Sequence, residues 1–284
     1  MTADAAGQGD DWLKRGAAAT AALAETWGSL AEVCHDLASA EWLLPTECPG
    51  WSVQDQLSHL IGIERALMGE PPPEWDGPLG DHVKNDFAAM NETWVAVRRA
   101  VPGNDVLAEF RKVTSQRLAA LAGLSADEWA EVGFSPIGQV PYADFMDVRV
   151  FDSWVHEQDV RLALDRPGGG DGLASHIALD RVRGAMPFVV GKKAGTPDGA
   201  VVRFDLTGPG DDALRFDIGV EGGRARLVPA AGTPTVTLSM SSVNFTRLGC
   251  GRATGDAVEA AGGVALAGNA GLGRTVLGAM NFMF

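Results

Sequence analysis

Two segments far apart in the chain carry residues whose types and spacing could bind a metal ion. His59 closes the run 49–59, and Asp152 and His156 are four residues apart in the run 152–159. If both runs are helical, Asp152 and His156 lie on one helix face, and His59 could complete a three-ligand site across a helix pair. Three protein ligands would leave one coordination position free for water, a thiolate or a substrate.

The same spacings have simpler interpretations. An Asp and a His four residues apart in a helix often form only an intrahelical hydrogen bond or a solvated pair. Asp55 lies one turn before His59 and offers it a partner within its own helix. Asp159, three residues after His156, either orients that imidazole as an acceptor or faces solvent. Spacing alone leaves these alternatives open.

Composition narrows the class of protein. The chain has 284 residues, of which 46% are hydrophobic, and this is enough to form a real core in one large or two ordinary domains. The net charge of −14 disfavours nucleic acids and anionic membranes as partners, because their phosphates would be repelled. We therefore expect neither partner. No uninterrupted apolar stretch is long enough to span a bilayer.

The compartment is predicted from the cysteines and the N-terminus. Three scattered cysteines are too few for a disulfide framework, and an odd number fits a reducing compartment. The first residues lack the positive and apolar regions of a signal peptide. We therefore expect a cytoplasmic location.

Apolar periodicity predicts that the first half is helical. Ser52 is a good N-cap with Asp55 three residues on, while Gly16 and Gly28 are the weak points of the first helix. Several long helices joined by short loops predict a four-helix bundle, whose interior is a common place for a metal site. The predicted helices are 11–37, 52–70, 81–99 and 141–164, with short helical pieces over 104–121.

The composition changes abruptly at the glycine-rich stretch that begins near residue 165. Here we predict a domain boundary, with a helical domain over 1–165, a linker over 166–173 and a smaller α+β domain over 174–284. The α+β domain should begin with a helix and continue with strands separated by glycine-rich turns. The expected helix is 174–190 and the expected strands are 201–206, 214–218, 225–228 and 235–240.

Four sequence runs carry a family resemblance that covers nearly the whole chain. The run 49–60, which reads Pro-Gly-Trp-Ser-Val-Gln-Asp-Gln-Leu-Ser-His-Leu, resembles the signature of the mycothiol-dependent maleylpyruvate isomerase family, a branch of the DinB-like metal-binding bundles. The run 152–161 is similar to that family's later helix. The runs 248–252 and 269–274 resemble its C-terminal domain, which is akin to sterol-carrier-protein-like folds.

The resemblance implies specific site residues. His59, Asp152 and His156 would be the metal ligands, with Asp152 standing where the family often has the longer Glu, and Zn²⁺ is the expected ion. Arg252 would anchor a substrate carboxylate, although a helix-capping or solvated arginine is the competing interpretation. Among the tryptophans, which mostly serve as core and loop anchors, Trp51 and Trp154 are the candidates to line a cofactor pocket.

The expected function is that of a metal-dependent enzyme. The resemblance implies mycothiol as a low-molecular-weight thiol that attacks an electrophilic small molecule, in an isomerase or an S-transferase with its site between the two domains. The alternative is a non-catalytic protein that kept the bundle and holds an apolar or thiol-bearing ligand. The oligomeric state cannot be read from the sequence.

Overall fold

The computed structural model describes residues 3–208, 214–230 and 232–283. The chain divides into two compact units, unit 1 over Met1–Ala178 and unit 2 over Leu179–Phe284. The division falls inside a helix, α7 (Leu173–Phe188), just after the predicted linker. Among the helices of the described residues, none combines the length and the apolar character that crossing a membrane requires.

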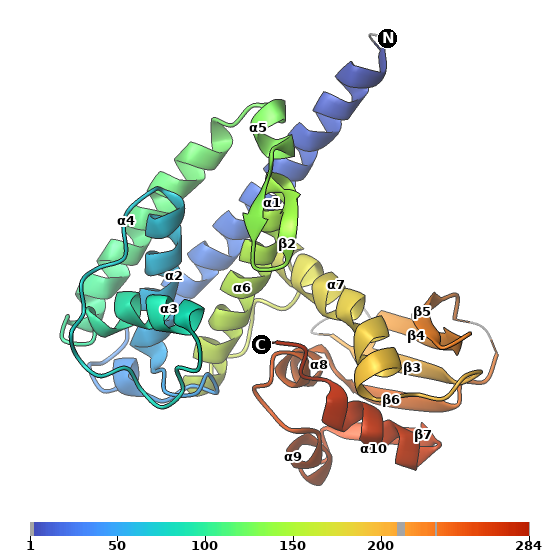
Figure 1. Ribbon diagram of the computed structural model, residues 1–284. Coiled ribbons are helices and arrows are strands. Elements are labelled where there is room, and N and C mark those ends of the chain that lie inside the picture. Colours follow the sequence, from blue (N-terminus) through green and yellow to red (C-terminus); the bar gives the residue numbers. More distant parts are fainter. Residues whose placement is uncertain (1–2, 209–213, 231, 284) are drawn as a thin grey trace. The chain divides into compact units, whose positions relative to one another are not determined.

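Unit 1 is built on four long helices, which agrees with the predicted bundle, although residues 104–121 form one continuous helix where short pieces were expected. They are α1 (Ala3–Val33), α2 (Val53–Leu67), α4 (Gly103–Ala122) and α6 (Tyr142–Ala163). Helix α1 packs against α4 and α6, and α2 packs against the same two, so that the four close around one core (Figure 1). Large apolar side chains with almost no exposed surface fill that core, among them Trp27, Leu57, Ile61, Phe110 and Met146.

Shorter elements surround the bundle. The one-turn 3₁₀ helix η1 (Glu41–Leu43) and helix α3 (Asp86–Ala96) pack on or near α2, while α5 (Ala126–Ala130) packs on α1 and α6. An antiparallel hairpin of β1 (Val132–Ser135) and β2 (Gly138–Pro141) leads into α6. The sequence analysis did not predict this hairpin, because strands of four residues that are largely exposed carry no clear alternation of apolar and polar side chains.

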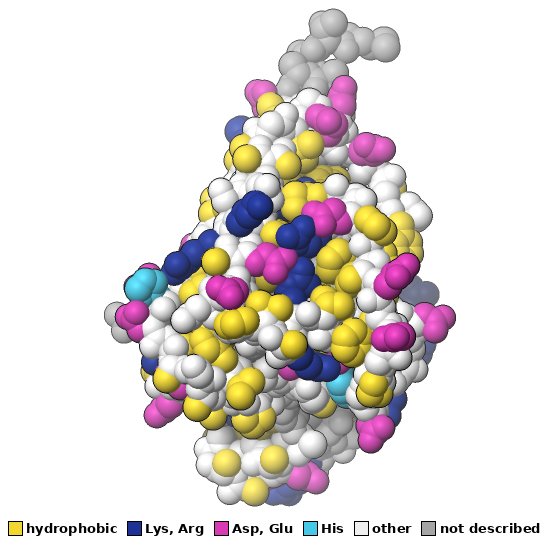
Figure 2. Space-filling view, turned by 90° about the vertical axis from the view of Figure 1, so that its left-hand side faces the viewer, with side chains coloured by type: hydrophobic (Ala, Val, Ile, Leu, Met, Phe, Trp, Pro, Cys, Tyr) yellow, Lys and Arg dark blue, Asp and Glu magenta, His cyan; other side chains and the backbone are white. Residues whose placement is uncertain are grey.

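The surface of the bundle is mixed in charge. On the face drawn in Figure 2, Lys and Arg side chains are interspersed with Asp and Glu side chains. Ion pairs such as Arg65–Glu109 and Arg98–Glu109 join α2, the end of α3 and α4. Basic and acidic side chains thus occur together on this face.

The two glycines of α1 occupy very different surroundings. A Cβ on Gly16 would lie 2.2 Å from the ring of Trp129, whereas a Cβ on Gly28 would meet nothing within 4 Å. We therefore expect Gly16→Ala to destabilise unit 1 by about 1–3 kcal/mol through overpacking. Gly28→Ala should stabilise it by about 0.5–1 kcal/mol through helix propensity. Urea unfolding of both variants measures these changes, and equal effects of the two would contradict the packing seen for Trp129.

Unit 2 is an α+β unit. Its five-stranded sheet has the order β5–β4–β3–β6–β7, in which β3 and β6 are parallel and the other neighbours are antiparallel. The rings of Phe204, Phe216 and Phe245 lie 5.0–5.9 Å apart between centroids and form the centre of its core. The strands are β3 (Val201–Thr207), β4 (Leu214–Glu221), β5 (Arg224–Val228), β6 (Val236–Ser241) and β7 (Val264–Gly268).

The helical elements of unit 2 come before β3, between β6 and β7, and after β7 in the chain. The end of α7 continues into a π-helical turn, η2 (Val189–Lys193), and α8 (Ser242–Gly249) begins at the N-cap Ser241. Helices α9 (Gly255–Ala260) and α10 (Ala270–Ala279) complete the unit. The four predicted strands are present, and β7 is an additional edge strand whose Ala and Gly content concealed it in the sequence.

Hydrogen bonds join the glycine-rich segment 166–173 to α1 and α6 of the same unit. The indole N–H of Trp154 donates to the Gly169 carbonyl at 2.6 Å, and Gln158 donates to the Gly168 carbonyl. At the end of the segment, Glu25 of α1 accepts from the backbone N–H groups of Leu173 and Ala174, which are the first two of α7. The segment is therefore held by α1 and α6.

Candidate metal centre

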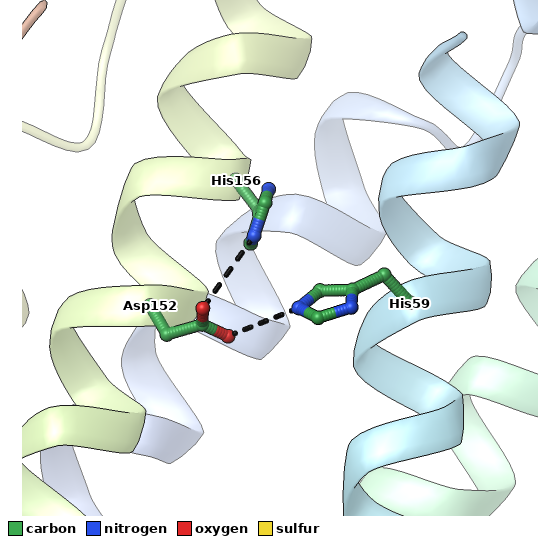
Figure 3. Close-up of side chains that lie close together, drawn as sticks. All are labelled: His59, Asp152 and His156. Atoms are coloured by element: carbon green, nitrogen blue, oxygen red, sulfur yellow. Dashed lines mark ion pairs between the residues drawn. The ribbon is translucent and has the colours of Figure 1, made fainter. Parts of the chain in front are cut away.

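The three predicted ligands converge in the interior of the bundle. His59 lies in the second turn of α2, and Asp152 and His156 lie on α6, one turn apart (Figure 3). Figure 3 shows the carboxylate of Asp152 between the two imidazoles. Because α2 packs against α6, residues separated by about 90 positions in sequence are brought to one point.

The distances fit a single small cation. His59 Nε2 lies 3.4 Å from Asp152 Oδ2, and His156 Nε2 lies 3.6 Å from Asp152 Oδ1. One ligand atom from each residue can be chosen so that all three lie within 4.8 Å of one another. Tetrahedral coordination with bonds of about 2.0–2.1 Å places neighbouring ligand atoms roughly 3.3–3.4 Å apart. The cluster can therefore close on one ion after only small side-chain shifts.

His59 gives the clearest sign of a missing partner. Its side chain is buried, and neither ring nitrogen has a hydrogen-bond partner among the described residues. Asp55 does not supply one, because it forms the predicted capping box with Ser52 and an ion pair with Arg99. Buried polar atoms without partners are rare and call for an explanation. A cation next to Nε2 would satisfy one of them.

His156 is oriented for coordination by its other nitrogen. Its Nδ1 lies 2.5 Å from Oε1 of Gln56 and 3.5 Å from Oδ2 of the buried Asp159. Both are acceptors, so Nδ1 carries a proton, and Nε2, which faces Asp152, is the nitrogen left to bind an ion. Asp159 thus faces the imidazole rather than solvent, which resolves one alternative that the spacing left open. Gln56, one turn before His59, was not identified from the sequence.

Trp51 forms one wall of the cluster. Its ring centroid lies 4.9 Å from that of His59 and 5.8 Å from that of His156. The indole N–H donates to Oε2 of the buried Glu92 at 2.9 Å, and the same oxygen lies 2.9 Å from Nε2 of His82. These bonds fix the indole plane, so that an apolar aromatic face borders the ligands.

A buried series of charged groups lies behind Asp152. Arg149 Nη1 donates to Asp152 Oδ2 at 2.5 Å, and its Nε and Nη2 donate to Glu64 Oε1 at 2.9 and 2.7 Å. The other oxygen of Glu64 accepts from Arg117 Nε at 2.9 Å. The sequence analysis missed these residues, although Arg149 lies one turn before Asp152 on the same face of α6.

Burial and charge set the protonation of the three groups. Burial lowers the pKa of His59 to about 4, although the Asp152 carboxylate opposes this. For His156, burial acts in the same direction, but Asp152 and Asp159 outweigh it and raise the pKa. Burial would raise the pKa of Asp152, yet Arg149 and the two imidazoles hold it well below its usual value. At neutral pH, His59 is neutral and Asp152 is ionised, as metal ligands must be.

Metal affinity should therefore fall as the pH is lowered. A proton on His156 must be displaced on binding and competes first, because its pKa is raised; protonation of His59 competes only near pH 4. Chelator-competition titrations with Zn²⁺ in steps from pH 8 to pH 5 measure the trend. The expected result is a progressive loss of up to about tenfold per pH unit below the pKa of His156. An affinity that is independent of pH would contradict the assignment of His156 as a ligand.

The other two predicted site residues make structural contacts, each within its own unit. Trp154 is on a different face of α6 from His156, and its indole is engaged with the Gly169 carbonyl. Arg252 lies in unit 2, directly after α8, where its backbone N–H bonds to the Arg247 carbonyl and closes the helix end. For both residues, the described contacts are structural. Their roles toward a cofactor or a substrate carboxylate stay predictions.

The fold and the cluster define a class: a helical-bundle protein with a buried pair of histidines and one carboxylate, followed by an α+β unit. Residues 23–161 match the family described as the mycothiol maleylpyruvate isomerase N-terminal domain. Residues 176–269 match the C-terminal domain of the same family. The chain therefore belongs to the mycothiol maleylpyruvate isomerase family.

One solved structure agrees with this assignment at the level of the fold, and two more are reported as weaker likenesses. The structure of the mycothiol-dependent maleylpyruvate isomerase is 16% identical to this chain and has a TM-score of 0.50. The match covers 91% of this chain and 92% of the isomerase chain. A mutant of that protein gives the same identity and coverage with a TM-score of 0.49. The sterol carrier protein 2 of Yarrowia lipolytica is 17% identical and has a TM-score of 0.31. The match covers 39% of this chain and 91% of the sterol carrier protein. No curated protein matches the chain.

Proposed function

We propose that this protein is a metal-dependent enzyme that activates a low-molecular-weight thiol, mycothiol, for attack on an electrophilic small molecule. One observation carries the proposal: three ligand groups from two helices converge, and the imidazole of His59 is buried without a hydrogen-bond partner among the described residues. Family membership supports mycothiol as the thiol. Zn²⁺ is the ion that best suits two imidazoles and one carboxylate.

Different residues of the chain would bind the ion and surround the thiol. His59, Asp152 and His156 would hold the ion, and the single negative charge of Asp152 would leave the occupied site with a net charge of about +1. When bound, the ion would lower the pKa of a coordinated thiol so that it is a thiolate at neutral pH. Trp51 would exclude water from one side of the thiol and offer it an aromatic face. No nucleophile from the protein itself is required.

Cys34 is not suited to replace an external thiol as the nucleophile. Burial raises the pKa of the Cys34 thiol to about 12, so this residue is protonated and unreactive at neutral pH. Addition of the external thiol to an unsaturated substrate would give one of two outcomes. If the thiol is expelled after bond rotation, the product is an isomer; if it is retained, the product is an S-conjugate. The first defines an isomerase and the second an S-transferase.

The proposal is tested by combining elemental analysis of the purified protein with a thiol-consumption and product screen. Maleylpyruvate and halogenated or epoxide electrophiles are offered with mycothiol and with other small thiols. We expect about one metal ion per chain and thiol-dependent conversion of at least one substrate. Full activity after the metal has been removed would overturn the proposal, as would ligand-dependent stabilisation without any turnover, which is the behaviour of a pure binding protein.

A further inference from the structure

We propose that Arg149 is a positioning residue for Asp152: it holds the carboxylate between His59 and His156 so that the three groups can share one ion. The inference rests on the proposed function in one respect, namely that the cluster binds a metal. It goes beyond that function because it assigns the geometry of the site to a residue that does not itself coordinate.

Asp152 needs such support because it is the most exposed of the three groups. Its side chain retains 27% of its accessible surface, against 6% for His59 and 7% for His156. A partly exposed aspartate can rotate toward water and leave the imidazoles. Arg149, one turn earlier on α6, donates from Nη1 to Asp152 Oδ2 and opposes this rotation. The Oδ1 atom is thereby left facing His156.

Glu64 holds the side chain of Arg149 in place. The side chain of Arg149 is buried, and its Nε and Nη2 both donate to Oε1 of Glu64 on α2. A guanidinium is planar and rigid, so two bonds on one edge set the direction in which the third nitrogen points. Arg149 therefore cannot follow the carboxylate outward without breaking its bonds to Glu64.

Glu64 is anchored independently of Arg149. Its side chain has no exposed surface, and its Oε2 accepts from Arg117 Nε of α4. Removing Arg149 would free Asp152 while Arg117 and Glu64 still join α2 to α4. A positioning role and a purely structural role of Arg149 can thus be separated experimentally.

Whether removal of Arg149 strengthens or weakens metal binding separates a competing role from a positioning role. Arg149 and a metal ion both approach the carboxylate of Asp152. If the guanidinium competed with the ion, its removal would strengthen binding. If it positions the ligand, its removal weakens binding, and loss of such outer contacts typically costs about 10- to 100-fold in affinity.

The test is Arg149→Met in the full chain. The Zn²⁺ dissociation constant is measured by chelator competition, and the coordination geometry is measured from the absorption spectrum of the Co²⁺-substituted protein. We expect a dissociation constant about 10- to 100-fold higher than that of the wild type and an altered Co²⁺ spectrum. An unchanged or lower dissociation constant would overturn the inference.

The matched control is Arg161→Met. Arg161 is also a largely buried arginine of α6 paired with a carboxylate, that of Glu157, and its guanidinium contacts Ser29 of α1. The Arg161→Met variant should be less stable than the wild type and keep its Zn²⁺ dissociation constant. An equal loss of affinity in both variants would mean that losing any buried arginine of α6 weakens binding, and this would also contradict the inference. If Arg149→Met does not fold, Arg149→Lys replaces it: this variant keeps the charge but loses the planar fork that reaches Glu64 and Asp152 together, and it should weaken binding in the same direction. A wild-type protein that binds no metal would refute the proposed function, whereas normal binding by a folded Arg149→Met variant would refute this inference alone.

Discussion

His59→Ala should lose both the bound metal and the thiol-dependent activity. The substitution removes the only predicted ligand that comes from α2, and the two groups left on α6 cannot hold an ion with three protein bonds. Losing several kcal/mol of electrophilic assistance corresponds to a fall in rate of at least about 1,000-fold. Elemental analysis and turnover with the substrate found by screening measure the two losses. The overall fold should persist, because the ring nitrogens of His59 have no hydrogen bonds to lose within the described chain.

The control for this prediction is His35→Ala. His35 is an exposed histidine near the end of α1, paired with Asp36 at 2.7 Å. The same substitution there should leave metal content and turnover at their wild-type values. If His59→Ala kept stoichiometric metal and full activity, the candidate centre would have to be abandoned.

Glu64→Ala should be among the most destabilising single substitutions in unit 1. Glu64 is fully buried and is the shared partner of two buried guanidinium groups, those of Arg117 and Arg149. Removing one partner from a buried ion pair leaves an uncompensated charge and costs about 3–5 kcal/mol. Urea unfolding followed by tryptophan fluorescence measures the loss selectively, because all eight tryptophans of the chain lie in unit 1.

Glu70→Ala serves as the comparison for Glu64→Ala. Glu70 follows α2 and pairs with Arg65 at 2.7 Å, but both side chains are partly exposed. Such pairs contribute about 0–1 kcal/mol. A loss in Glu64→Ala no larger than that in Glu70→Ala would show that the buried series contributes little to folding.

Residue periodicity predicted the bundle, but the choice of the three ligands also needed the family resemblance. Ser52 and Asp55 marked the start of α2, and the four-residue spacing of Asp152 and His156 placed both on one face of α6. The family resemblance then favoured His59 as the third member over its bond to Asp55. The structure confirms that the three groups meet, while their binding of an ion stays a prediction.

The supporting contacts could not be predicted in the same way. Glu64 and Arg117 belong to different helices, and the pairing of their side chains depends on how far α2 and α4 are shifted along each other. A single sequence does not fix that shift, since several alignments would bury equally apolar faces. Trp154 makes another contact that the sequence did not predict: its indole bonds to the glycine-rich segment, while its role at a cofactor pocket stays a prediction.

The way residues 166–173 are fastened to α1 and α6 determines where the chain can be cut. A truncation after residue 165 would strip Trp154 of its carbonyl acceptor and Glu25 of the two amides it caps. A truncation after residue 178, the last of unit 1, would keep these bonds but interrupt α7. The helical half should therefore be produced on its own only with all of α7 included, and a protease should cleave slowly within the glycines despite their composition.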